Sequence, residues 1–181
     1  MKPAGELTGA GWRIVFVRSG DRIAHHVELA DGDQREPLLV SIEGSPDEPS
    51  PASPPLQQVH FQPLPGGGQA ALLVGMAGRS HWSAAVEVPA DGRQAAFEIA
   101  CRAVAPPAWL GSSYRLESKL TVEYSPTSVW LGPLELAIEP LGQAAAPTWT
   151  LGQQVLQLAV SPPAGRWPQT IIWRYALRCR T

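Results

Sequence analysis

Residues 114–124 read Tyr-Arg-Leu-Glu-Ser-Lys-Leu-Thr-Val-Glu-Tyr and carry the clearest alternation of apolar and polar side chains in the chain. The apolar side chains take every second position, interrupted once by a serine (Tyr114, Leu116, Leu120, Val122 and Tyr124). Charged side chains and a threonine fill the positions between them. Successive side chains of a β-strand point to opposite faces, so this period of two predicts one half-buried strand over residues 114–124.

The same period of two recurs on both sides of this stretch. Strand-like segments occupy residues 12–17, 23–29, 38–43, 58–62, 70–76, 82–88, 94–102, 134–138, 156–160 and 170–180. Residues 70–76 are apolar at almost every position and predict a buried strand. The connections are too short for parallel crossovers, which predicts antiparallel pairing. We therefore expect an all-β antiparallel β-sandwich or jelly-roll-like barrel of about ten strands, with little or no helix.

The composition excludes several other classes of protein. Glycine (17) and proline (19) are too frequent among 181 residues for long helices or a coiled coil. A hydrophobic content of 44% argues against disorder, and a net charge of −2 argues against a nucleic-acid partner. No apolar run approaches the ~20 residues that span a bilayer, and no apolar signal segment follows the first residues. We expect a cytoplasmic protein without a membrane partner, and the preference for arginine over lysine indicates a bacterial, GC-rich genome.

The chain is expected to form a single domain over residues 1–181. Residues 44–55 carry five prolines and predict an exposed loop rather than a domain boundary. The three strands before this loop could hardly bury a core alone, so we interpret it as an insertion between strands of one sheet system.

Seven tryptophans are a high count for this length, and four of them recur at intervals of 18–21 residues (Trp109, Trp130, Trp149 and Trp167). The first interpretation is that each indole seals one end of the sandwich where a strand begins. The alternative is a solvent-exposed aromatic platform that stacks on sugar rings or on a peptide. In that case Trp109 and Trp149, together with Tyr114, are the candidate ligand-binding residues, and Trp130 could share an end with Trp167.

Residues 78–82 form the most chemically mixed stretch of the chain, with Arg79, His81 and Trp82 as candidate ligand-binding residues. Ser80 lies beside His81 here, but the glycine pattern of a nucleophile elbow is absent and neighbouring side chains of a strand diverge. No catalytic residue is therefore predicted.

A second candidate surface is the row of arginines on the polar side of the last strand, namely Arg174, Arg178 and Arg180. We expect this row to pair with acidic side chains of a neighbouring strand such as Glu98, or else to bind an anion or a partner. Cys101 and Cys179 both fall on the inward sides of their strands, and their thiols could be close if those strands are neighbours.

The histidines suggest a metal-dependent enzyme as a further alternative, built from His26, His60 and His81. His25 and His26 are adjacent on a strand and point to opposite faces, so only one of them could join such a site. The spacing that places two imidazoles on one strand face is absent, and the sequence predicts neither a metal site nor a cofactor.

The leading hypothesis is a non-enzymatic binding or protein-interaction module, whose partner is another protein or a second copy of the chain. Few titratable residues cluster, and the chain combines aromatic residues with Pro- and Gly-rich loops, a combination common in recognition scaffolds. A carbohydrate-binding β-sandwich that uses loop tryptophans is the first alternative.

Overall fold

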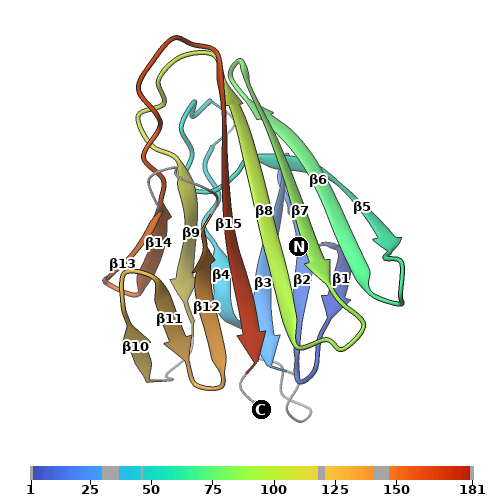
Figure 1. Cartoon of the computed structure of the whole chain (residues 1–181). Coiled ribbons are helices and arrows are strands. Elements are labelled where there is room, and N and C mark those ends of the chain that lie inside the picture. Colours follow the sequence, from blue (N-terminus) through green and yellow to red (C-terminus); the bar gives the residue numbers. More distant parts are fainter. Residues whose placement is uncertain (1, 30–36, 46, 118–120, 141–146, 180–181) are drawn as a thin grey trace.

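The computed structural model describes residues 2–29, 37–45, 47–117, 121–140 and 147–179. This part of the chain contains β-strands and no helix, and consequently no helix that could cross a membrane. Fifteen strands form two antiparallel sheets that pack face to face, as Figure 1 shows. The all-β antiparallel sandwich predicted from the sequence is confirmed.

The seven-stranded sheet has the order β1-β2-β3-β4-β9-β14-β13. Its strands are β1 (Lys2–Thr8), β2 (Trp12–Ser19), β3 (Arg22–Leu29), β4 (Pro37–Ser41), β9 (Gly111–Leu116), β14 (Val155–Ala159) and β13 (Thr148–Gly152). The eight-stranded sheet has the order β10-β11-β12-β15-β8-β7-β6-β5. Its strands are β10 (Val122–Tyr124), β11 (Ser128–Leu131), β12 (Leu134–Glu139), β15 (Gln169–Cys179), β8 (Gln94–Ala103), β7 (Ser80–Val88), β6 (Gln69–Ala77) and β5 (Leu56–Pro63).

The single strand predicted over residues 114–124 is wrong, because the segment belongs to two strands in different sheets. Its first part pairs with β4 and β14 as β9, and its last part pairs with β11 as β10. Alternation indicates an extended backbone, and both β9 and β10 are extended, although in β10 Val122 is only half-buried and Glu123 and Tyr124 are exposed. It carries no information about a passage from one sheet to the other.

The core lies between the sheets and is rich in aromatic rings. Phe97 of β8 stacks on Tyr175 of β15 with 4.6 Å between ring centroids, and Trp82 meets Trp173 edge to face at 6.0 Å. Stacked and edge-to-face pairs stabilise a core beyond the area that they bury. The inward side chains predicted for the last strand are confirmed from Ile171 to Leu177.

Residues 44–55 are exposed only in part, which corrects the prediction of an exposed loop. The side chains at positions 45 and 47–49 are exposed, whereas Pro51 and the run 53–55 are buried. Ser53 Oγ accepts a hydrogen bond from the Ser113 N–H (3.1 Å) and donates one to the Ser113 carbonyl (3.0 Å). Proline richness indicates irregular backbone, and here that backbone leads from β4 in one sheet to β5 in the other, while Ser53 and Pro54 line a small cavity between the sheets.

Candidate functional site

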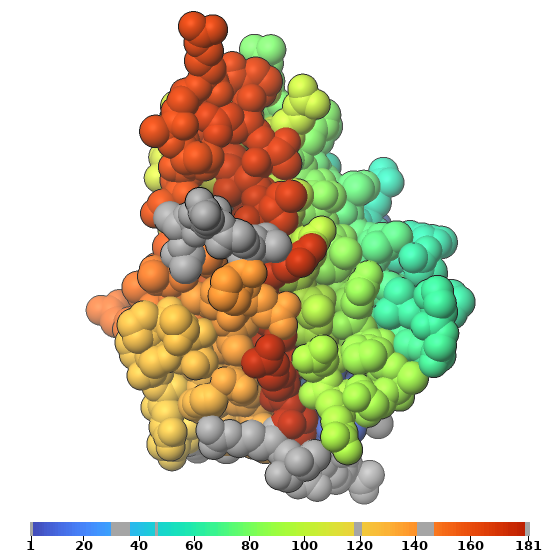
Figure 2. Space-filling view, viewed as in Figure 1, coloured from blue at the N-terminus to red at the C-terminus, as the bar shows by residue number. Residues whose placement is uncertain are grey.

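The outer face of the eight-stranded sheet carries most of the exposed apolar side chains. Figure 2 looks onto this face, where β15, β8, β7 and β6 run side by side. Among the described residues, six large hydrophobic side chains are exposed, and five of them lie on this face or at its end: Leu72, Val74, Met76, Val104 and Ile172. Large apolar side chains gathered on one face, rather than scattered singly, are typical of an interaction surface.

Strand β6 supplies three of these side chains at successive outward positions. Leu72, Val74 and Met76 are 37%, 51% and 43% exposed, whereas Leu73 between them is buried. The prediction that residues 70–76 form a buried strand is therefore wrong for one of its two faces. The signal for this surface in the sequence is the apolar run of residues 70–76. Only one side of this strand is covered, so the apolar side chains on its other side are exposed, whereas the apolar run predicted that both sides belong to the core.

An open hollow of about 520 Å³ lies at the β6–β7 end of this face. We call it the cationic hollow, and its lining residues are Met76, Gly78, Arg79, His81, Arg102, Val104 and Pro168. His81 of β7 stands directly opposite Arg102 of β8 in the strand register, and opposite Met76 of β6 on its other side. The hollow thus combines two arginines and a histidine with exposed apolar side chains.

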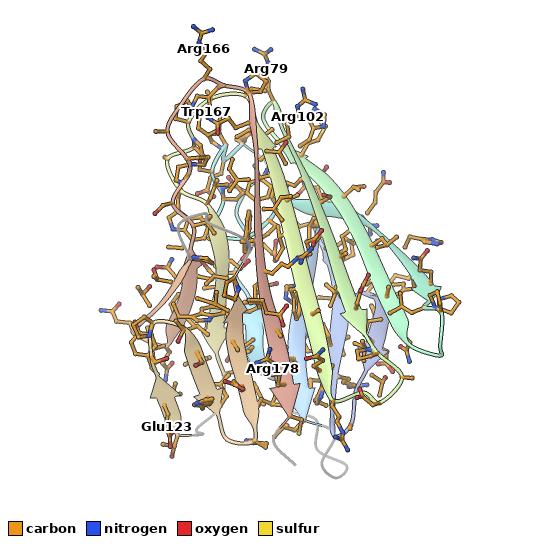
Figure 3. The ribbon with its side chains drawn as sticks, viewed as in Figure 1. Arg79, Arg102, Glu123, Arg166, Trp167 and Arg178 are labelled. Atoms are coloured by element: carbon orange, nitrogen blue, oxygen red, sulfur yellow. The ribbon has the colours of Figure 1, made fainter. Side chains whose placement is uncertain are left out.

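Three arginines at this end of the molecule have no carboxylate partner among the described residues. Figure 3 shows Arg79, Arg102 and Arg166 at the same end. None of the three forms an ion pair with a carboxylate of the described residues, although five other arginines do. An arginine that stays unpaired beside apolar side chains remains available to a planar anionic group, which it can bind through two parallel hydrogen bonds.

A second open hollow, of about 320 Å³, lies further along the same face. We call it the acidic hollow, and its lining residues are Ala85, Glu87, Ala96, Phe97, Glu98, Glu139 and Arg174. Arg174 forms an ion pair with Glu98 on the adjacent strand. Three carboxylates and one guanidinium leave this hollow with a net negative charge.

The arginine row of the last strand is largely used inside the chain. Arg174 pairs with Glu98, as expected from the sequence, and Arg178 pairs with Glu139 at 3.1 Å. Both arginines are therefore occupied by carboxylates of neighbouring strands, which leaves the anion-binding interpretation without support. Arg180 lies outside the described residues.

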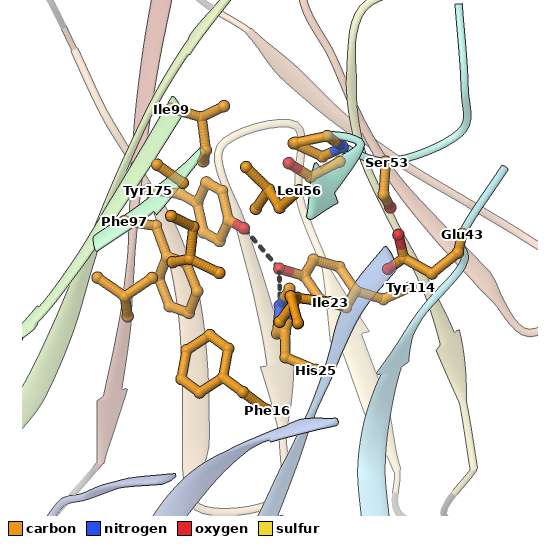
Figure 4. Close-up of a pocket in the computed structure, with 15 residues that line it drawn as sticks. Phe16, Ile23, His25, Glu43, Ser53, Leu56, Phe97, Ile99, Tyr114 and Tyr175 are labelled. Atoms are coloured by element: carbon orange, nitrogen blue, oxygen red, sulfur yellow. Dashed lines mark hydrogen bonds between the residues drawn. The ribbon is translucent and has the colours of Figure 1, made fainter. Parts of the chain in front are cut away.

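A polar cluster occupies the core between the two sheets (Figure 4). The hydroxyl of Tyr114 lies 3.0 Å from His25 Nε2 and 2.5 Å from the hydroxyl of Tyr175. The Ser41 hydroxyl donates to Glu43 Oε1 (2.6 Å), while the buried Glu43 Oε2 has no hydrogen-bond partner among the described residues. The cavity that these side chains line has a volume of about 20 Å³, room for about one water molecule and too little for a substrate.

Burial determines how this cluster titrates. Burial, followed by the nearby His26, lowers the pKa of His25 to about 4. Burial raises the pKa of Glu43 to about 7, against the opposing effects of the Ser41 hydrogen bond and the Arg22 charge. Burial likewise raises the pKa of Tyr175 to about 12. The cluster therefore keeps His25 and both tyrosines uncharged at neutral pH.

The histidines proposed for a metal site do not come together. His26 and His25 point to opposite faces as predicted: His25 lines the internal cavity, and His26 lies 2.8 Å from Glu28. His26 belongs to the seven-stranded sheet, whereas His60 and His81 belong to the other sheet. The described residues contain no group of three His, Cys, Asp or Glu side chains placed to hold a metal ion.

The aromatic platform predicted for Trp109, Trp149 and Tyr114 does not form. Trp149 and Tyr114 are 0% and 2% exposed, so neither can stack on a ligand at the surface. Trp82 is also buried, against Trp173, so of the three candidate residues in the stretch 78–82 only Arg79 and His81 are exposed. Trp109, Trp130 and Trp167 are half-buried, and Trp167 packs against the core.

The two cysteines lie far apart although their strands are neighbours. Cys101 stands opposite Ile171 in the register of β8 and β15, and Cys179 is eight residues further along β15. At about 3.3 Å per residue, this separation is about 26 Å. The sequence left open whether these two strands are neighbours, and it does not specify the register that separates the thiols.

Comparison of the chain with protein-family models, with curated proteins and with solved structures finds no match.

Proposed function

We propose that the protein is a non-enzymatic interaction module that binds a partner protein through the outer face of its eight-stranded sheet. The observation that carries this proposal is the cationic hollow, where unpaired Arg79 and Arg102 stand beside exposed Met76 and Val104. A partner that fits this chemistry presents carboxylates next to apolar side chains. Arginine and methionine are both enriched where proteins meet.

The chemistry of the surface favours a protein over a nucleic acid. Sequence-independent nucleic-acid binding needs several phosphate contacts along a basic track, and this chain carries a net charge of −2. Arg79 and Arg102 lie together at one end of the sheet face, and the acidic hollow on the same face would repel a phosphate backbone. A short acidic and apolar segment of a protein avoids that repulsion.

The experiment measures binding of a fluorescein-labelled peptide of alternating glutamate and leucine by fluorescence anisotropy. The double substitution R79E/R102E is expected to raise the Kd at least about 10-fold, because both charges in the hollow are reversed. R18E reverses an exposed arginine on the seven-stranded sheet and serves as the matched control, with an expected change below about twofold.

Three results would refute the proposal. They are an R79E/R102E Kd equal to that of the native chain, equal affinity for a lysine–leucine peptide, and tighter binding of a labelled single-stranded oligonucleotide than of the acidic peptide. Melting curves followed by circular dichroism verify that the variants remain folded.

A further inference from the structure

The outer face of the eight-stranded sheet is self-complementary about one row of side chains. Val74, Ser83, Ala100 and Ile172 stand opposite one another across β6, β7, β8 and β15, and we call them the central row. This row contains no charged residue, and its two large members, Val74 and Ile172, are 51% and 44% exposed.

The rows on either side of the central row carry complementary chemistry. Two residues toward the β6–β7 turn, the outward positions are Met76, His81, Arg102 and Thr170. Two residues in the other direction they are Leu72, Ala85, Glu98 and Arg174. Apolar Met76 thus mirrors apolar Leu72 on β6, and positive Arg102 mirrors negative Glu98 on β8.

We infer that a second copy of this chain binds face to face on this surface, related by a two-fold axis that runs along the central row. Such an axis keeps each strand over its own counterpart and reverses the strand direction. Arg102 then meets Glu98 of the second copy, Met76 meets Leu72, and the central row packs on itself. Every contact occurs twice, as in any isologous dimer. The second copy is the partner that the proposed function requires, and the inference rests on that function.

The distances within one sheet are compatible with this arrangement. Residues of a strand are about 3.3 Å apart, so Arg102 and Glu98 each lie about 7 Å from the central row on opposite sides. Their side chains are about 13 Å apart within one chain, which is too far for a direct ion pair. Packed sheets lie about 10 Å apart, a gap that an arginine and a glutamate can span together.

The charges of the two hollows also match when the copies are superposed in this way. The cationic hollow holds Arg79 and Arg102, and the acidic hollow holds three glutamates with Arg174. Two positive charges of one copy therefore lie over a hollow of the other in which three carboxylates outnumber the two guanidiniums that pair with them, those of Arg174 and Arg178. A surface that carried one sign throughout would repel its own copy, whereas this division favours association.

A charge-swap experiment tests the contact between Arg102 and Glu98. Sedimentation equilibrium is expected to show a dimer in the native chain, and R102E and E98R are each expected to raise its dissociation constant at least about 10-fold. The double variant R102E/E98R restores opposite charges only across the two copies, so its dissociation constant is expected within about threefold of the native value. R18E serves as the control.

E98R also breaks the ion pair between Arg174 and Glu98 within one chain, and a second variant separates this effect. E98Q breaks the same internal pair without placing a positive charge opposite Arg102, so it is expected to weaken the dimer less than E98R does. Circular dichroism melting confirms folding of each variant.

The outcomes distinguish this inference from the proposed function. A chain that stays monomeric while the acidic peptide still binds overturns the second copy as partner and leaves the interaction module. A dimer that the single variants leave unchanged, or that R102E/E98R fails to restore, overturns the face-to-face arrangement. A monomeric chain that also fails to bind the peptide overturns both.

Discussion

Glu43→Gln is expected to raise the free energy of unfolding by about 3 kcal/mol at pH 8 and to leave it almost unchanged at pH 4. Burial raises the pKa of Glu43 to about 7, from 4.5 in the unfolded chain. Between pH 4.5 and pH 7, Glu43 is therefore protonated in the folded state and ionised in the unfolded state. Because the folded state binds the extra proton, the free energy of unfolding falls as the pH rises from about 4.5 to 7. Glutamine resembles the protonated acid and removes this loss.

His25 acts in the opposite direction. Its pKa falls from 6.5 in the unfolded chain to about 4 in the core. The unfolded state therefore binds the extra proton, so stability is present above pH 6.5 and is lost as the pH falls toward 4. In the native chain the two effects largely cancel between about pH 4.5 and 6.5.

In the two single variants, the free energy of unfolding is expected to change with pH in opposite directions. Glu43→Gln leaves the His25 effect, a stability that rises by about 1.4 kcal/mol per pH unit from pH 4 to 6.5. His25→Gln leaves the Glu43 effect, a fall of similar size from pH 4.5 to 7. Urea unfolding at half-unit pH intervals measures both slopes. Parallel pH profiles for the two variants would contradict the burial of Glu43 and His25 described above.

Trp173→Ala is expected to destabilise the fold by about 3–5 kcal/mol, the range for removal of a large aromatic side chain from a core. Trp173 is 1% exposed on β15, which is paired on both sides within the eight-stranded sheet. Its ring meets Trp82, and its Nε1 donates to the Ser112 hydroxyl (3.4 Å) of the other sheet. The substitution removes contacts within one sheet and between the two.

Urea unfolding at pH 7 measures this loss against Trp167→Ala, which removes a half-buried indole and is expected to cost clearly less. Trp173→Phe retains a ring and keeps the comparison measurable where the alanine variant fails to fold. If Trp173→Ala and Trp167→Ala lower the free energy of unfolding equally, Trp173 does not contribute to the core between the sheets as described.

The architecture could be predicted from alternation because burial on one side leaves a period of two in the sequence. Residues 170–180 and 82–88 correspond closely to β15 (Gln169–Cys179) and β7 (Ser80–Val88). This pattern is weak in some strands. Strand β1 contains a proline and a glycine, and β11 has only four residues. The expected number of about ten strands was therefore too low. The change of sheet within residues 114–124 leaves no trace in the alternation at all.

The surface site could be predicted only in part. Arg79 and His81 were recognised because they are chemically mixed neighbours in the sequence. Arg102 joins them through the register of β7 and β8, which the sequence alone does not specify. Trp149 had two interpretations, a seal at one end of the sandwich or a member of an exposed platform, and an inward position on β13 places it in the core.

Oxidation of Met76 tests most directly whether the outer face of the eight-stranded sheet is the binding surface. Its thioether is exposed at the edge of the cationic hollow, and peroxide converts an accessible methionine to the sulfoxide. With the chain diluted below the dissociation constant of the dimer and the acidic peptide at saturation, the oxidation rate followed by mass spectrometry is expected to fall at least about fivefold, because a partner seated in the hollow covers Met76. An unchanged rate for Met76 while the peptide is fully bound would show that the partner binds elsewhere.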